Sequence, residues 1–428
     1  MKDNFQIIMV VVFIAAAILG VLVFSGAIPL GGGGSTTAGV GTVVLWGTIP
    51  DETMATLLEE YNTVDKNYTV QYIKKSAETF DQDLLEALAA GSGPDMFFLP
   101  DDLAYHYANK IFKIPLESYP IATFKNNFAG AGEVFLLSDG LLAFPITIDP
   151  LVLYYNRSIL DANNIVFPPK DWDEFIALVP KLTSKDANNK IIKSGAALGH
   201  FANVLHAKDI LSTLFMQLGD KIVAEKGGSF ISVLDENENL EPALVFYTGF
   251  ADPLKSIYSW NRSFPNSRDF FSTERLAFYF GFASEFPVLV NKNPNQNFQV
   301  APVPQLRGAA FKLTSANVTG IAISSFSKNL NTALIAASEM TAGEFARKFA
   351  TALGVAPARR DLLVQVPNDP FSPTFYSSAL FAKSWLDPSP KDTDNIFRTI
   401  VEGVLSSNLT ADNAIKDASA KLGLLLIR

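Results

Sequence analysis

The sequence predicts an α/β fold in which helices cover a mainly parallel sheet. Between residues 42 and 99, short apolar runs alternate with segments of helical spacing, in the order strand, helix, strand, helix, strand. A second unit of the same kind begins near Leu151, with an apolar strand followed by a helix. Such alternation is typical of a parallel sheet, and ligands bind beyond the carboxyl ends of its strands.

The first unit consists of five expected elements, each with its own pattern. In chain order they are Thr42–Leu45, Asp51–Tyr61, Tyr68–Ile73, Phe80–Ala90 and Met96–Leu99. Asp51 is a candidate N-cap of the first helix, and Gly91 and Pro94 end the second. The strands therefore end at Trp46–Asp51 and at Leu99–Asp102, where we expect a ligand.

The second unit is less regular in sequence. A strand is expected over Leu151–Tyr155, and Asp171–Glu174 opens a helix with a capping-box pattern. Residues 200–300 are rich in aromatic side chains and show no clear periodicity. Two helices are expected at the end of the chain, the first with the apolar face of Phe397–Leu405 and the second capped by Thr410.

The amino terminus predicts export. Phe5–Phe24 is a run of 20 residues without a charge, and such a run covers about 30 Å as a helix, the thickness of the bilayer core. Residues 1–27 are therefore either a transmembrane anchor or a signal segment cleaved after Ser25–Ala27, which would leave Ile28 first. The length of the run favours the anchor. Residues 28–41 then form a tether rich in Gly, Ser and Thr.

Composition excludes several classes of function. The chain has 428 residues, a net charge of −9 and no cysteine. The negative charge argues against nucleic acid, and the lack of cysteine excludes disulfides, thiol catalysis and zinc–thiolate sites. The three histidines show no metal-binding spacing. The adjacent Tyr154 and Tyr155 point to opposite faces of a strand, so they cannot both bind one metal ion. No phosphate loop, nucleophile elbow or zinc-protease motif is present, so we expect neither cofactor nor metal, and no enzyme.

Seven stretches, in the right order, resemble the family 1 extracellular solute-binding proteins of ABC importers, which are similar to maltose-binding protein. They are Leu88–Asp95, Asp139–Asn156, Pro168–Phe175, Arg275–Glu285, Val300–Pro304, Gly320–Ser327 and Gly354–Asp361. Two of them depart from the family pattern. Asp171 replaces a Thr in PPKDWDEF, and Gly281-Phe282-Ala283 stands where the family has Gly-x-Trp.

The resemblance implies a type II periplasmic-binding-protein-like fold, with two α/β lobes joined by a hinge around a ligand cleft. Lobe one would be residues 42–147 plus 317–356, and lobe two residues 148–316 plus 357–428. The family's function implies a monomer outside the cytoplasm that binds a small polar solute, a mono- or oligosaccharide, and delivers it to a permease. The alternative is a surface-anchored glycan receptor or adhesin without a transport role, and a carbohydrate-active enzyme is the less favoured third interpretation.

Three carboxylates are candidate ligand residues by this resemblance. Asp101 and Asp102 follow the strand Met96–Leu99, and Asp149 lies in the first crossing between lobes. Carboxylates accept strong hydrogen bonds from sugar hydroxyls. The competing interpretations are a solvated helix cap for Asp101 and Asp102, and a hydrogen bond between lobes for Asp149.

Aromatic residues and the turn after residue 281 complete the candidate site. Trp46, Trp260 and Phe282 offer flat apolar faces to a sugar ring, although core packing is the alternative for each. The resemblance adds Gly281 and the polar residues of its turn, Ser284 and Glu285. The last candidate is an arginine, Arg359 or its neighbour, for which a salt bridge is the alternative.

Overall fold

One long strand, β6 (Ala143–Asn156), runs through the middle of an 11-stranded mixed sheet. The computed structural model describes residues 41–64, 66–219, 221–236 and 239–427. The predicted anchor and nearly all of the predicted tether lie outside these ranges, and both stay predictions. Within the described ranges, no helix is long and apolar enough to cross a membrane.

The first part of the sheet, called here the β1 half, contains the three strands expected near the amino terminus. They are β1 (Gly41–Gly47), β2 (Tyr68–Lys74) and β3 (Met96–Pro100), and β1 pairs in parallel with both others. A strand from much later in the chain, β13 (Thr314–Ile323), lies between β3 and β6 and is antiparallel to both. The predicted parallel arrangement therefore holds for β1 to β3 but not for the strands that follow.

The other part of the sheet, called here the β11 half, is built on the second half of β6. It consists of β11 (Leu276–Phe282), β12 (Phe298–Pro302), β8 (Ile191–Ala196) and the two-residue β7 (Ser184–Lys185). Both β11 and β12 run antiparallel to β6, whereas β8 runs parallel to β11.

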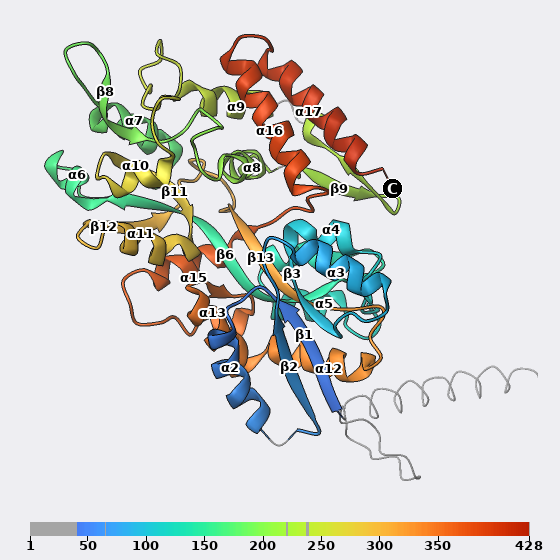
Figure 1. The fold of residues 1–428 in the computed structure, drawn as a ribbon. Coiled ribbons are helices and arrows are strands. Elements are labelled where there is room, and N and C mark those ends of the chain that lie inside the picture. The colour runs from blue at the N-terminus through green and yellow to red at the C-terminus, as the bar shows by residue number, and fades with distance from the viewer. Residues whose placement is uncertain (1–40, 65, 220, 237–238, 428) are drawn as a thin grey trace, which may run out of the picture. The chain divides into compact units, whose positions relative to one another are not determined.

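Strands β6 and β13 join the two halves (Figure 1). Residues 143–150 of β6 pair with β13 in the β1 half, and residues 151–155 pair with β11 in the β11 half. Two short strands lie beside this junction: β14 (Ala356–Pro357) on β6, and β15 (Ala382–Lys383) on β13. Two further pairs, β4–β5 (Leu136–Leu137, Gly140–Leu141) and β9–β10 (Val223–Lys226, Ser229–Ser232), stand apart from the main sheet.

Helices from distant parts of the chain cover each half (Figure 1). The helices that contact the β1 half or the strands beside it are α2 (Asp51–Thr63), α3 (Phe80–Ala89), α4 (Ala104–Tyr107), α5 (Ile121–Asn127), α12 (Leu330–Met340), α13 (Gly343–Leu353) and α14 (Arg360–Leu363). Those around the β11 half are α6 (Arg157–Ala162), α7 (Trp172–Leu182), α8 (Ala207–Gln217), α9 (Leu240–Gly249), α10 (Ser267–Ser272), α11 (Phe286–Lys292), α15 (Ser372–Leu380), α16 (Pro390–Leu405) and α17 (Ala411–Leu425).

Two of the three helix N-caps predicted from the sequence are present in the structure. The Asp171 side chain accepts a hydrogen bond from the Glu174 amide (2.8 Å), and Thr410 accepts one from Asn413 (3.2 Å), as expected for N-caps. Asp51 was expected to cap α2, and that expectation is wrong. Pro50 occupies the cap position, so Asp51 is the first helical residue and its charge favours the positive helix start.

The aromatic segment 200–300 is more regular than its sequence suggests. It contains four helices and four strands, among them β11, whose seven residues are all buried. A strand buried on both faces has no alternation of polar and apolar residues, which explains why the sequence pattern missed it. Its rings pack with others at centroid distances of about 5–6 Å, as Phe278 does against Phe175 (5.3 Å).

Candidate functional site

A cavity of about 360 Å³ lies at the junction of the two halves. The β1 half contributes Asp101 and Asp102, which follow β3, and the β11 half contributes the start of α8, Arg268 of α10 and the turn after β11. The start of β13, the last residue of β15 (Lys383), and Ser384, Trp385 and Asp387 after it complete the lining. The cavity thus lies beyond the carboxyl end of a parallel strand, where such folds bind ligands.

Asp101 is a buried carboxylate whose oxygens are already bonded within the protein. It is 6% exposed; Oδ1 accepts a hydrogen bond from the Val318 amide (3.0 Å), and Oδ2 accepts one from the Ser384 hydroxyl. Burial, followed by the neighbouring charge of Asp102, raises the pKa of Asp101 to about 7. Asp101 therefore links β3 to β13 and to the segment after β15, and has little capacity left for a ligand.

Asp102 and Asp209 are carboxylates that face the cavity without such partners. Asp102 comes from the β1 half and Asp209 from α8, and neither side chain has a hydrogen bond to another described residue. Burial raises the pKa of Asp102, and the Asp387 charge adds to this effect. Burial also raises the pKa of Asp209, against the opposing influence of His206 and Lys208. A ligand that donates hydrogen bonds would relieve the desolvation of both groups.

Lys208 and Asp387 form an ion pair at the wall of the cavity. Lys208 Nζ lies 2.8 Å from Asp387 Oδ2, and the two side chains are 16% and 4% exposed. The Thr393 hydroxyl and the Ser389 amide also donate hydrogen bonds to Asp387. Beside this pair, the partly buried ring of Trp385 lines the cavity, with Lys208 Nζ 5.9 Å from its centroid.

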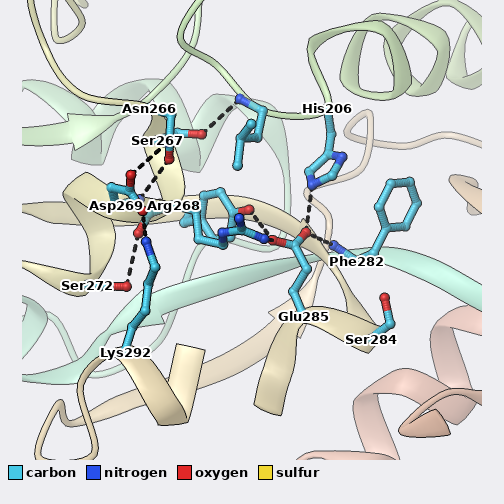
Figure 2. A network of polar contacts seen from close by, with 12 residues as sticks. His206, Asn266, Ser267, Arg268, Asp269, Ser272, Phe282, Ser284, Glu285 and Lys292 are labelled. Atoms are coloured by element: carbon cyan, nitrogen blue, oxygen red, sulfur yellow. Dashed lines mark hydrogen bonds and ion pairs between the residues drawn. The ribbon is translucent and has the colours of Figure 1, made fainter. Parts of the chain in front are cut away.

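Glu285 is the centre of a buried network on the opposite wall (Figure 2). Oε1 accepts a hydrogen bond from the Phe282 amide (2.9 Å) and lies 2.6 Å from His206 Nε2. Oε2 accepts a hydrogen bond from the Tyr279 hydroxyl (2.5 Å) and a longer contact from Arg268 (3.4 Å). Burial acts to raise the pKa of Glu285, but these donors, His206 first, outweigh it and lower that pKa.

A family comparison gives this cavity its context. A model of the bacterial extracellular solute-binding proteins matches residues 56–374, most of the chain. The chain belongs to this family. The family predicted from the seven sequence stretches is thereby confirmed.

Solved structures show the same fold as this solute-binding protein. The sugar-binding protein of Xanthomonas citri has 17% sequence identity and a TM-score of 0.72, over 90% of this chain and 97% of that one. A cyclo/maltodextrin-binding protein complexed with maltotetraose also has a TM-score of 0.72, at 17% identity, over 89% of this chain and 96% of that one. An ABC transporter solute-binding protein of Thermotoga lettingae, bound with tagatose, has a TM-score of 0.64 at 22% identity, over 90% of this chain and 100% of that one.

Two curated relatives match over shorter stretches. An uncharacterised lipoprotein of Streptomyces antibioticus is 25% identical over 231 residues, 49% of each chain. The maltotriose-binding protein of Pyrococcus abyssi is 27% identical over 156 residues, 36% of this chain and 32% of that one. The match thus spans about half of the first relative and a third of the second.

The structure brings together five of the ten residues proposed from the sequence. Those that line the cavity of the solute-binding protein are Asp101, Asp102, Phe282, Ser284 and Glu285. The five others lie outside its lining, each with a partner or packing role of its own, and their assignment to the ligand stays a prediction.

Both tryptophans among these five pack inside the protein. Trp46 is 8% exposed at the end of β1, with Lys75 Nζ 3.7 Å from its ring centroid. Trp260 is fully buried and donates a hydrogen bond to Asn203 (2.9 Å). These contacts agree with the core-packing alternative stated for both residues.

Each of the remaining three residues has a contact elsewhere in the protein. Asp149 accepts a hydrogen bond from the Ser284 amide (3.0 Å), and burial raises its pKa to about 6. Gly281 lies inside β11, where a Cβ atom would come within 2.6 Å of the Tyr279 ring. Arg359 forms a two-point ion pair with Asp361 (2.9 and 3.0 Å), as its alternative interpretation stated.

Sequence reasoning missed several lining residues of the solute-binding protein. These are His206, Lys208, Asp209 and Arg268 from the β11 half, Lys383 at the end of β15, and Ser384, Trp385 and Asp387 after it. The density of charges in 206–209 was the signal available, but nothing local indicates that this segment lies opposite Asp102. No group of three or more metal-binding side chains occurs among the residues that the structure describes.

Proposed function

We propose that the chain is the extracytoplasmic receptor of an ABC import system and binds a sugar in the cavity between two closing lobes. Family membership supports solute binding. The ligands bound by two of its structural neighbours, maltotetraose and tagatose, suggest the class of solute. The lobes would be residues 42–147 plus 317–356 and residues 148–316 plus 357–428, and the crossing strands β6 and β13 would form the hinge.

The observation that carries the proposal is a pair of carboxylates without a hydrogen bond to any other described residue. Asp102 and Asp209 reach the same cavity from different halves. Both are held partly out of water without a hydrogen-bonded partner among the described side chains. A polyol that donates hydroxyl groups to both would bind the closed arrangement better than the open one, which is the condition for ligand-driven closure.

The remaining lining fits a neutral polyol better than an anion. Five carboxylates line the cavity, against the three cationic side chains Lys208, Arg268 and Lys383 and one histidine. Each of these three cations already contacts a carboxylate within the protein. The ring of Trp385 adds an apolar face for the C–H surface of a sugar. The volume lies within the range of small-molecule sites, about 300–1,000 Å³.

Attachment and delivery complete the proposal. If residues 1–27 stay uncleaved, they would hold the receptor at the membrane, and the glycine-rich tether would keep it near a permease at a raised effective concentration. Amino-terminal sequencing of the mature protein tests this part. If the mature protein begins at Ile28, the segment is cleaved and the receptor is released instead of anchored.

Calorimetry of the full-length chain with a sugar panel tests the binding function. The panel contains maltose, maltotriose, maltotetraose, mannobiose and tagatose. We expect at least one sugar to bind, and to bind about ten- to a hundredfold more weakly to Asp102→Asn or Asp209→Asn. Each substitution removes a hydrogen bond to a charged acceptor, which contributes about 1.5–3 kcal/mol.

An exposed carboxylate outside the cavity provides the control. Asp412 pairs with Lys416 on the surface of α17, and Asp412→Asn should leave sugar affinity unchanged. Small-angle scattering should show a smaller radius of gyration with the bound sugar. If no panel sugar binds and none of them changes the radius of gyration, the sugar-receptor proposal is refuted.

A further inference from the structure

We propose that His206 contacts the bound solute through Nδ1, and that protonation changes this atom from a hydrogen-bond acceptor into a donor. Solute affinity would then depend on pH. The inference rests on the proposed function because it assigns a role at the same cavity. Glu285, which the sequence suggested as a ligand residue, becomes the positioning residue that orients the imidazole.

The backbone holds His206 in an unusual conformation at the cavity. Its φ is 60°, in the left-handed region, immediately before the first residue of α8. Residues other than glycine adopt this region rarely, so the surrounding contacts must maintain it. The side chain is 24% exposed and lines the cavity. Its ring packs edge-to-face against Phe282, with centroids 4.7 Å apart.

Glu285 determines which ring nitrogen carries a proton. Nε2 lies 2.6 Å from Oε1 of this carboxylate, whose side chain is only 9% exposed. An unprotonated nitrogen would place its lone pair against a negative oxygen, so Nε2 carries a hydrogen in both charge states of the ring. The contacts of Glu285 with Tyr279 and the Phe282 amide fix the carboxylate in turn.

The second nitrogen is therefore the one that titrates. Figure 2 shows one imidazole nitrogen on Glu285 and the other directed away from it. Nδ1 has no hydrogen bond to any other residue described by the structure. In the neutral ring it is an acceptor, and in the imidazolium it is a charged donor. A donor with positive charge forms the stronger bond with a hydroxyl oxygen.

The electrostatic surroundings of His206 favour its protonated form and raise its pKa. Burial acts to lower the pKa of His206, but the Glu285 contact overcomes it and, with Asp209 and Asp149, raises the pKa above the ordinary value of 6.5. The other charged groups that line the cavity are Lys208 on α8, Arg268 on α10, Asp101 and Asp102 after β3, Lys383 at the end of β15, and Asp387 after β15.

Imidazole ¹⁵N NMR on the full-length chain tests the proposal without a ligand. The chain has three histidines, so the signal of His206 is assigned by its loss in His206→Asn. Asparagine tolerates the left-handed backbone, which makes it the least disruptive replacement. We expect the Nε2–H form at high pH and protonation at Nδ1 with a pKa above about 6.5. An Nδ1–H form, or a ring that does not titrate between about pH 5 and pH 9, overturns the proposal.

Affinity measurements form the second arm. With the tightest sugar of the panel, we expect affinity to fall about five- to tenfold as His206 loses its proton, because a charge-assisted bond is replaced by a neutral one. The pKa values of Asp101, about 7, and of Asp149, about 6, mean that these two carboxyl groups also change charge as the pH is varied. The informative quantity is therefore the difference between wild type and His206→Asn, and His200→Asn, outside the cavity lining, is the matched control. Equal pH dependence in wild type and His206→Asn overturns the proposal.

Glu285→Gln tests the positioning role. It retains an acceptor for the Phe282 amide and removes the charge beside Nε2. We expect the His206 pKa to fall and the pH dependence of affinity to move to lower pH with it, which a purely structural defect would not produce. An unchanged His206 pKa refutes the role of Glu285. If no panel sugar binds, the sugar proposal fails, and the NMR arm still decides the tautomer and the role of Glu285.

Discussion

Replacing Lys208 by methionine should destabilise the protein more than any surface charge would. The substitution keeps most of the apolar stem but removes the ammonium group that lies 2.8 Å from Asp387. Asp387 is 3% exposed and would remain as a buried carboxylate without its cation. Loss of one partner of a buried ion pair costs about 3–5 kcal/mol.

The structure places the expected cost at the lower end of that range. The Thr393 hydroxyl (2.8 Å) and the Ser389 amide (3.0 Å) still donate to Asp387 after the change. We therefore expect a loss of about 3 kcal/mol in the free energy of unfolding for Lys208→Met. The double variant Lys208→Met/Asp387→Asn removes both charges, and most of the lost stability should return.

Urea denaturation of the wild type, both single variants and the double variant measures the coupling energy of the pair. Lys416→Met is the matched control because Lys416 forms an exposed pair with Asp412 one helical turn away. It should leave the free energy of unfolding nearly unchanged, because water screens an exposed pair. The reasoning is refuted if Lys208→Met costs less than about 1 kcal/mol and the double variant behaves as the sum of the single ones.

Three further substitutions address other features of the structure. Asp171→Ala removes the cap of α7 and should lower the free energy of unfolding by about 1–2 kcal/mol in urea; no change would contradict the capping role. Burial raises the pKa of Asp101 to about 7, so the folded state binds this proton more tightly than the unfolded state. Wild-type stability should fall as pH rises between about 4 and about 7, and Asp101→Asn should flatten that slope when unfolding is followed against pH. Trp260→Phe leaves Asn203 without its buried donor and should cost about 1–3 kcal/mol in thermal unfolding while sugar affinity stays unchanged; a weakened affinity would place Trp260 at the ligand.

The first hundred residues of the folded part were predictable because their signals are local. The spacing of Met54, Leu57, Leu58 and Tyr61 predicts the buried face of α2 as the structure has it. Strand β6 was predicted only from Leu151, although it begins at Ala143. Nearly the whole strand is buried, but the part before Leu151 also contains Pro145 and Pro150, and proline within a run argues against a strand in the sequence.

The candidate site was predictable only where it follows a strand end. Asp102 was found because a strand with a recognisable end precedes it, and the family pattern pointed to Phe282. Asp209 and Asp387 could not be found in this way, because they reach the cavity through tertiary packing of α8 and of the segment after β15. Trp46 also ends a strand, but it packs inward beside Lys75 and lies outside the cavity lining, so its contact with a ligand stays a prediction.

The strand order has a consequence for how the chain acquires its structure. Residues 314–323 lie between two strands made of residues 96–100 and 143–156. During synthesis the amino-terminal sheet therefore lacks a central member until about three quarters of the polypeptide has left the ribosome. Unpaired strand edges are prone to aggregate, so β3 and β6 are exposed to wrong pairing until β13 lies between them.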